Sequence, residues 1–198
     1  MVRERLGLLG GTFDPPHLGH LAAAVEVRES LGLDRVLLLV ANEPWQKVGG
    51  RPLSAPADRL AMTEASCAGI DGVEASSIEI ARGGPTYTID TLEELRERAP
   101  DAEFFLIVGA DAAAGLDTWE RHRELPSLAT LVIVDRAGDA EPPIPAGWTV
   151  EHVGMPRLDV SSTGLRARVA AGRSLTPYVP QSVIDIIEER SLYGSARP

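Results

Sequence analysis

Short apolar runs alternate with amphipathic stretches along most of the chain, and this alternation is the feature that most restricts the fold. We predict buried strands at Leu6–Gly10, Arg35–Ala41, Glu103–Val108 and Leu131–Val134, because each is a short run rich in large apolar side chains. Strands that alternate with helices form a mostly parallel sheet with right-handed crossovers. The sequence therefore predicts an α/β fold with a Rossmann-like, doubly wound, mostly parallel sheet.

The stretches between these runs have the spacing of helices. His17–Leu31 places apolar side chains near helical spacing, and Gly32 follows as a C-terminal stop signal. Thr88 and Asp90 are candidate N-caps of a later helix. The remaining expected elements are helices at Pro56–Ala68, Thr88–Ala99, Ser162–Ala171 and Gln181–Glu189, and strands at Val73–Ala81 and Trp148–Val153.

The length of 198 residues fits one domain, and the sequence contains no internal repeat and no clear linker. The segment Ala137–Gly147 is rich in Pro, Gly and acidic residues and is predicted to be a solvent loop. We expect a single domain over residues 1–198, with a small C-terminal helical part from about residue 161 packed on it.

The charge balance excludes one large class of function. The chain has 19 Lys and Arg against 29 Asp and Glu, a formal charge of −10. Proteins that coat nucleic acid need basic side chains to neutralise phosphates, so a polynucleotide partner is not expected. The single Cys67 excludes an internal disulfide framework, and the longest apolar run, Val36–Ala41, is too short to span a bilayer. We therefore expect a soluble, cytoplasmic protein with no membrane partner.

The most informative motif, GGTFDPPHLGH at residues 10–20, follows the first strand. Its glycines let a ligand approach the backbone closely, and the start of the next helix offers N–H groups and a positive dipole end to phosphate. His17 and His20 lie at i and i+3, so they share a face if both are helical. The motif predicts a phosphate site at the carboxyl end of a strand, where doubly wound sheets bind ligands.

Other interpretations of this motif stay open. Glycines and prolines after a strand often form only a turn, and a histidine at a helix start is often a cap or a surface residue. His17, His20 and Asp14 could bind a metal, although zinc needs three or four ligands of defined geometry and the sequence has no second His/Cys cluster. Neither the P-loop pattern nor the dinucleotide-binding glycine pattern is present, so both of those sites are excluded.

A second helix start near the C-terminus is also suited to phosphate. Ser161, Ser162 and Thr163 form an N-cap cluster, and Arg166 follows one turn later, where its guanidinium can hold phosphate oxygens. The alternative is an ordinary capped surface helix. An acidic protein must bind a triphosphate through local positive groups. The candidate groups are His17, His20, Lys47 and Arg166.

The motif at residues 10–20 resembles the T/H-x-G-H signature of the nucleotidyltransferase superfamily, and its GGTFDPxHxGH form resembles bacterial nicotinate mononucleotide adenylyltransferases. Further motifs resemble the same family in order along the chain: Arg82–Leu92, Gly109–Asp111 with Trp119, Ser161–Arg166, and the tail from Val179 to Tyr193. The resemblance implies the nucleotidyltransferase fold. It also implies adenylyl transfer from ATP to nicotinate mononucleotide in NAD biosynthesis, giving nicotinate adenine dinucleotide and pyrophosphate.

The resemblance also implies which residues form the site. The residues implied to act on the reacting phosphates are His17, His20, Lys47 and Arg166. The implied ATP-binding residues are Gly10, Gly11, Thr12, Phe13, His17, His20, Ser162, Thr163 and Arg166. The residues implied for nicotinate mononucleotide are Asn42, Lys47, Thr86, Tyr87, Asp111 and Trp119. Mg²⁺ would bridge the triphosphate with few direct protein ligands, because this ion keeps its waters and uses substrate oxygens.

Lys47 is the only lysine of the chain. Its loop reads Pro-Trp-Gln-Lys where the resembling family often has Pro-Pro-His-Lys, so the loop conformation and any role of Trp45 stay open. Lys47 either neutralises substrate phosphate or is a solvated loop residue. The pair Gly49-Gly50 favours the hypothesis that Pro44–Leu53 closes over the substrate as a lid.

The acceptor residues have alternative interpretations as well. Trp119 either stacks on the pyridine ring or lies in the core. Asp111 accepts hydrogen bonds from ribose hydroxyls, caps a helix, or does both. Thr86 and Tyr87 would present backbone amides to the nicotinate carboxylate, and Tyr87 is equally suited to packing.

Adenylyl transfer to a phosphate needs no general base, because the nucleophile is already ionised at neutral pH. Catalysis then depends on positioning and charge stabilisation. Two other functions stay open: a superfamily transferase with another acceptor, such as the phosphopantetheine type, or a non-catalytic nucleotide sensor on the same fold. The sequence has no coiled-coil pattern and no large apolar stretch that would indicate an interface, so a homo-oligomer is neither predicted nor excluded.

Overall fold

The computed structural model describes residues 3–44, 53–136 and 142–194. Six strands form one sheet in the order β4-β2-β1-β6-β7-β8, and every neighbouring pair is parallel. The strands are β1 (Arg5–Gly11), β2 (Arg35–Val40), β4 (Val73–Ser76), β6 (Glu103–Gly109), β7 (Thr130–Arg136) and β8 (Val150–Met155). The doubly wound parallel sheet predicted from the sequence is confirmed, and the strand order reverses between β1 and β6.

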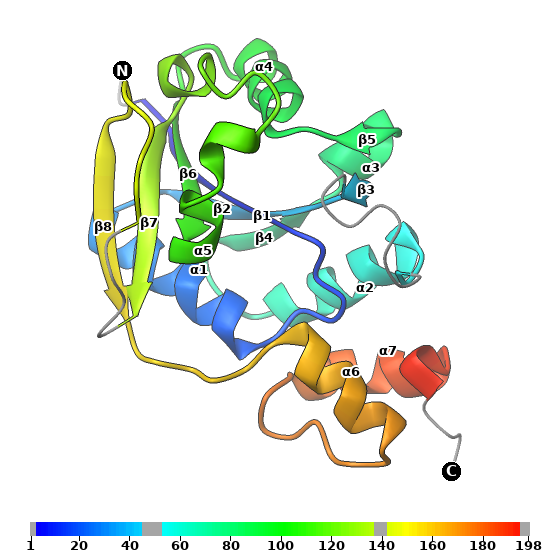
Figure 1. Ribbon diagram of the computed structural model, residues 1–198. Helices are drawn as coiled ribbons and strands as arrows, with labels where there is room; N and C mark the ends of the chain where they lie inside the picture. Colours follow the sequence, from blue (N-terminus) through cyan, green and yellow to red (C-terminus); the bar gives the residue numbers. More distant parts are fainter. Residues whose placement is uncertain (1–2, 45–52, 137–141, 195–198) are drawn as a thin grey trace.

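Helices cover both faces of this sheet (Figure 1). They are α1 (Leu18–Leu31), α2 (Pro56–Cys67), α3 (Ile78–Arg82), α4 (Thr88–Arg98), α5 (Ala110–Ala113), α6 (Ser162–Ala170) and α7 (Gln181–Glu189), with short 3-10 turns at Leu116–Thr118, Leu125–Ser127 and Leu192–Gly194. Helix α1 ends as predicted, because Gly32 adopts a left-handed conformation with φ of 59°. In the described residues, we find no helix with both the length and the apolar character needed to cross a membrane.

The strands form two separate cores because successive side chains point to opposite faces of the sheet. Leu8 and Leu106, which are register partners, pack with the α4 side chains Ile89 and Leu92 on one face. Phe105 belongs to the core on the other face, with α1. A sheet buried on both faces explains why the strands read as continuous apolar runs rather than as alternating ones.

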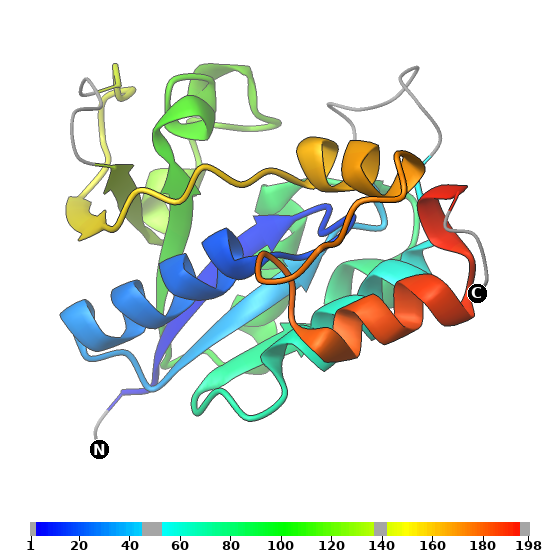
Figure 2. The ribbon, with the colours of Figure 1, turned by 90° about the horizontal axis from the view of Figure 1, so that it is seen from below.

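The C-terminal helices pack against α2 (Figure 2). Met62 of α2 shares a buried cluster with Leu165 of α6 and Val183 of α7. The Ser182 hydroxyl donates to the Ala65 carbonyl at 2.9 Å, which fixes the start of α7 on α2. The described residues after 161 therefore contribute to a hydrophobic core shared with α2.

Two local predictions differ from the structure, and one element was not predicted. The expected strand Val73–Ala81 ends at Ser76, where the Ser76 hydroxyl accepts from the Ile78 N–H at 3.4 Å and the chain turns into α3. The N-cap of α4 is Tyr87, so neither Thr88 nor Asp90 caps that helix. A second, two-stranded parallel sheet pairs β3 (Glu43–Pro44) with β5 (Pro85–Thr86), and strands of two residues are too short to leave a sequence pattern.

Candidate active site

The histidine loop, residues 10–20, leaves the carboxyl end of β1 beside the point where the strand order reverses. Gly11 has no room for a side chain, because a Cβ there would lie 2.8 Å from the Phe13 ring. A Cβ on Gly10 would meet no protein atom within 4 Å. Phe13 itself adopts a positive φ of 49° and is buried. The Phe13 ring therefore packs against the backbone at Gly11, whereas no protein atom fills the space beside Gly10, so a ligand can approach the backbone there.

The two histidines lie against each other at the start of α1. Their rings stack with centroids 3.8 Å apart, and the His17 backbone N–H donates to His20 Nδ1 at 3.2 Å. Because His20 Nδ1 is an acceptor, the neutral ring carries its proton on Nε2, which makes that nitrogen a donor. Gly19 permits this stack, since a Cβ there would lie 3.1 Å from the His17 ring. The condition for a shared helical face does not hold, because His17 is the N-cap rather than a helical residue, yet the two rings still lie together.

The start of α6 lies directly against the histidine loop. Ser161 is the N-cap, and its Oγ accepts from the Gly164 N–H at 3.1 Å. The Ser162 hydroxyl donates to the Pro15 carbonyl at 2.8 Å. Arg166 donates to the Asp14 carbonyl at 2.7 Å and to Thr163 Oγ1 at 2.8 Å. The structure therefore brings together the two helix N-termini that the sequence predicted as phosphate sites, although they lie more than 140 residues apart.

Asp14 is 1% exposed, and the donors to its carboxylate include Tyr193 and Ser54. Tyr193 Oη donates to Asp14 Oδ1 at 2.6 Å, and the Ser54 N–H approaches Oδ2 at 3.4 Å. In the three described ranges, no three His, Cys, Asp or Glu residues gather closely enough to hold a metal ion. The alternative of a metal site made of Asp14 and the two histidines is therefore not supported.

Arg59 is a functional candidate that no sequence motif marks. Its side chain is 1% exposed, and its guanidinium donates to four backbone carbonyls. These acceptors are the carbonyls of Ser54 (3.0 Å), Thr12 (3.0 Å), Ala41 (2.5 Å) and Asn42 (2.9 Å). Burial lowers the pKa of Arg59, while the nearby Asp14 carboxylate acts in the opposite direction. Arg59 thereby joins the histidine loop to the end of β2.

The predicted acceptor residues Asn42 and Thr86 are brought together from different parts of the chain. The Asn42 backbone N–H donates to Thr86 Oγ1 at 2.9 Å, and its side-chain amide donates to the Gly84 carbonyl at 2.9 Å. The short β3–β5 sheet continues this contact. We call residues 42–44 and 83–87 the acceptor segments. Tyr87, which ends them, packs partly against the core under α4.

Asp111 and Trp119 follow the neighbouring strand β6. Asp111 is an exposed residue in the first turn of α5, whose N-cap is Gly109, so the alternative of Asp111 as the cap is wrong. Trp119 packs partly against the core, and no acceptor for its buried Nε1–H lies among the described residues. Lys47, Trp45 and most of the predicted lid Pro44–Leu53 lie outside the described residues.

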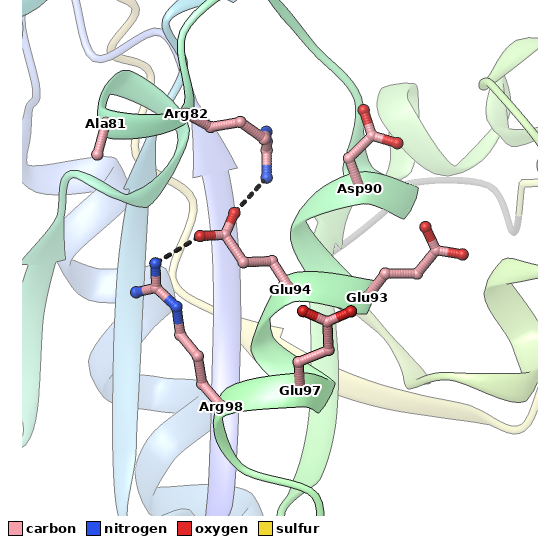
Figure 3. Close-up of a pocket in the computed structure, with 7 residues that line it drawn as sticks. All are labelled: Ala81, Arg82, Asp90, Glu93, Glu94, Glu97 and Arg98. Atoms are coloured by element: carbon pink, nitrogen blue, oxygen red, sulfur yellow. Dashed lines mark hydrogen bonds and ion pairs between the residues drawn. The ribbon is translucent and has the colours of Figure 1, made fainter.

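A shallow groove between α3 and α4 lies beside the acceptor segments (Figure 3). Glu94 accepts there from Arg82 at 2.9 Å and from Arg98 at 2.5 Å. Between the same two helices, buried Glu79 accepts from the Thr91 hydroxyl at 2.8 Å, and burial raises the pKa of Glu79. These contacts join the helix before residues 83–87 to the helix after them.

Comparison with known proteins then identifies the family. A family model described as cytidylyltransferase-like matches residues 8–168. The chain belongs to this family. The match begins within β1 and ends within α6, so it spans both of the helix N-termini that meet at the site.

Curated relatives and solved structures indicate which proteins of known name the chain is similar to. The chain is 45% identical over 192 residues to the probable nicotinate-nucleotide adenylyltransferase of Corynebacterium kroppenstedtii, covering 96% of this chain and 90% of the relative. It is 44% identical over 191 residues to the protein of the same name from Thermus thermophilus, covering 96% and 99%. The Plasmodium falciparum nicotinic acid mononucleotide adenylyltransferase complexed with NaAD has a TM-score of 0.79 at 16% identity, covering 99% of this chain and 100% of that one. This last match shows the fold alone.

Proposed function

We propose that this chain transfers the adenylyl group of ATP to nicotinate mononucleotide, forming nicotinate adenine dinucleotide and pyrophosphate in NAD biosynthesis. The observation that carries the proposal is the meeting of two helix N-termini, α1 with its stacked histidines and α6 with Arg166, at one edge of the sheet. Helix N-termini and a guanidinium bind phosphate groups well. The names of the curated relatives support the choice of acceptor.

On the ATP side, His20 and His17 would contact the phosphates near the reacting centre. Their partners on that side would be Arg166 at the β/γ end and the loop and helix-start residues Gly10, Gly11, Thr12, Phe13, Ser162 and Thr163. The mononucleotide phosphate attacks the α-phosphorus in line, the new P–O bond forms, and pyrophosphate leaves. The Nε2–H of His20 would donate to a phosphate oxygen, and the bond from the His17 N–H to His20 Nδ1 supports this assignment of the ring proton. Such a donor stabilises charge that develops in the transition state.

On the acceptor side, Asn42 and Thr86 would place the nicotinate ring, and the backbone amides of Thr86 and Tyr87 would meet its carboxylate. Asp111 would accept from the ribose hydroxyls. Trp119 would stack on the pyridine ring, and we propose Lys47 for the phosphate of the mononucleotide. The hydrogen bonds of Asn42 to Thr86 and Gly84 support this arrangement, since they hold the two acceptor segments together.

Mg²⁺ would arrive as the ATP complex. The ion prefers phosphate oxygens and water over a dedicated set of protein ligands. In the Mg²⁺ complex the ion neutralises charge on the triphosphate. The residues of this chain then have to orient that complex, and the two helix N-termini are suited to this task.

The whole chain would act as one domain in the cytoplasm. The cluster that joins Met62, Leu165 and Val183 supports a single domain. The single cysteine fits a reducing compartment. The possible homo-oligomer stays a prediction.

The proposal is tested by measuring pyrophosphate release from ATP and Mg²⁺ with the purified protein and separating the products. Nicotinate mononucleotide, 4′-phosphopantetheine and no acceptor are run in parallel. We expect release only with the mononucleotide, with one dinucleotide formed per pyrophosphate. Release with 4′-phosphopantetheine and not with nicotinate mononucleotide would show that the chain is a transferase of the phosphopantetheine type. Tight nucleotide binding without release under any condition would establish the sensor.

A further inference from the structure

The C-terminal part of the chain contacts the histidine loop at several points. Beside the two contacts from α6 to Pro15 and Asp14, two more come from residues after the family match ends at 168. The Leu18 N–H donates to the Tyr178 carbonyl at 3.0 Å. The Tyr193 hydroxyl donates to Asp14 Oδ1 at 2.6 Å, across 179 positions of sequence. The extreme end of the described chain thus reaches the turn that carries the histidines.

The contact between Tyr193 and Asp14 has the features of a strong one. A hydrogen bond to a carboxylate is short and about twice as strong as a neutral one, and a buried carboxylate is costly unless donors satisfy it. Burial and the Asp14 charge both raise the pKa of Tyr193, so the phenol keeps its proton and remains a donor. Tyr193 also has a positive φ of 59°, a conformation that a non-glycine residue keeps only where its surroundings fix it.

We propose that Tyr193 is a positioning residue for adenylyl transfer: by holding the Asp14 carboxylate, it fixes the turn that places His17 and His20 against the triphosphate. Asp14 lies one residue after Phe13 and three before His17, so a movement of Asp14 moves the histidine rings directly. The effect on rate can be large, because a displacement of about 1 Å at a reacting group costs about a hundredfold. The inference rests on the proposed function.

The test compares Tyr193→Phe with the matched change Tyr178→Phe. Tyr178 belongs to the same C-terminal part, its side chain is exposed, and its ring contact with Arg168 does not need the hydroxyl. We measure kcat, the KM values of ATP and nicotinate mononucleotide, and the Tm of each variant. A non-hydrolysable ATP analogue gives a Kd by calorimetry.

We expect Tyr193→Phe to lower kcat about ten- to hundredfold and to weaken binding of the analogue, with the KM of the mononucleotide within twofold of wild type. Tyr178→Phe should match wild type throughout. Kinetics and binding are measured at 37 °C and at 15 °C. A loss that is present at 37 °C and disappears at 15 °C would show a merely structural role and would overturn the proposal, as would wild-type values for Tyr193→Phe at both temperatures.

A double-mutant cycle with Asp14→Asn tests whether Tyr193 acts through Asp14. If it does, the two changes are strongly non-additive, and the double variant is about as impaired as the worse single variant. Additive losses would contradict the proposed route. Should wild type release no pyrophosphate, the proposed function fails. The analogue Kd then decides the positioning role by itself, since equal affinities of wild type and Tyr193→Phe would refute it.

Discussion

The histidine loop and the acceptor segments meet at the same edge of the sheet, yet they are held in different ways. The histidine loop is held by side chains from distant parts of the chain, among them buried Arg59 and the half-buried Arg166 and Tyr193. The acceptor segments are joined by strands of two residues and by the bonds of Asn42 to Thr86 and Gly84. Glu43 and Pro85, which pair in that small sheet, are both exposed.

This difference matches what each side has to do. Transfer at the α-phosphorus requires the reacting groups to be held in a narrow range of geometry, which favours a loop held by many partners. Recognition of the acceptor requires only a few correctly placed polar groups. Arg59 connects the two sides, since it donates both to Thr12 of the histidine loop and to Asn42 of the acceptor segments.

The largest effect is expected at the histidine loop. His20→Ala should lower kcat about 10²- to 10³-fold, because it removes a donor aimed at the reacting phosphates. The Tm should fall slightly, since His20 is only partly buried but its Nδ1 accepts from the His17 N–H at the start of α1. Steady-state kinetics and thermal unfolding measure both. His152→Ala, at an exposed histidine on the far strand β8, is the control and should keep full activity. Activity of His20→Ala within a few-fold of wild type would show that His20 has no such role.

Arg59→Lys tests the link between the two sides. An ammonium cannot reach four carbonyls at once, so we expect the free energy of unfolding to fall by about 2–4 kcal/mol, as buried acceptors lose their donors. Both KM values should rise together. Denaturant unfolding and two-substrate kinetics measure these effects. Arg98→Lys, at an exposed ion pair, is the control and should be close to wild type. A rise in the KM of only one substrate would contradict the proposal that Arg59 connects the histidine loop to the acceptor segments.

Thr86→Val tests whether the acceptor segments affect binding of the mononucleotide without affecting binding of ATP. The Asn42 N–H loses its acceptor, at a cost of about 1 kcal/mol, so the KM of nicotinate mononucleotide should rise about fivefold. The KM of ATP should not change. Thr86→Ser keeps the hydroxyl and should restore the wild-type value. Equal changes in the KM of ATP and of nicotinate mononucleotide would mean that the histidine loop and the acceptor segments do not bind their substrates independently.

The smallest effect is expected at the start of α6. Ser161→Ala removes the acceptor for the Gly164 N–H and should cost about 1 kcal/mol of stability, with kcat almost unchanged. Ser161→Asp keeps an acceptor and should retain most of the stability. Denaturant unfolding distinguishes the two variants. A Ser161→Ala variant as stable as wild type would show that the cap contributes nothing.

The fold was predictable because the signals that define it are local. Runs such as Arg35–Ala41 are buried on both faces and read as strands without any tertiary information. Val73–Ala81 is predicted as one strand because its sequence partly alternates, but the turn at Ser76 involves a hydrogen bond that the pattern does not contain. The two-residue strands β3 and β5 depend on the contact between Asn42 and Thr86, which exists only after folding.

Some residues of the candidate site are predictable from local sequence motifs, and others are not. The histidines and the capped start of α6 were visible because each is a short motif with its own physical meaning. Arg59 and Tyr193 were not assigned roles, because their partners are backbone carbonyls and a carboxylate that lie far away in sequence. A buried arginine has no local signature, since it differs from a surface arginine only in what surrounds it.

Nicotinate mononucleotide is proposed to receive the adenylyl group where the histidine loop and the acceptor segments meet. The most direct measurement is the ratio of kcat/KM for pyrophosphate release with the nicotinate and the nicotinamide mononucleotide, measured in parallel with ATP and Mg²⁺. We expect rapid release with the acid and much slower release with the amide, because the amide lacks the carboxylate that the acceptor segments are proposed to bind. Equal rates would contradict that recognition, and no release with either would contradict the claim itself.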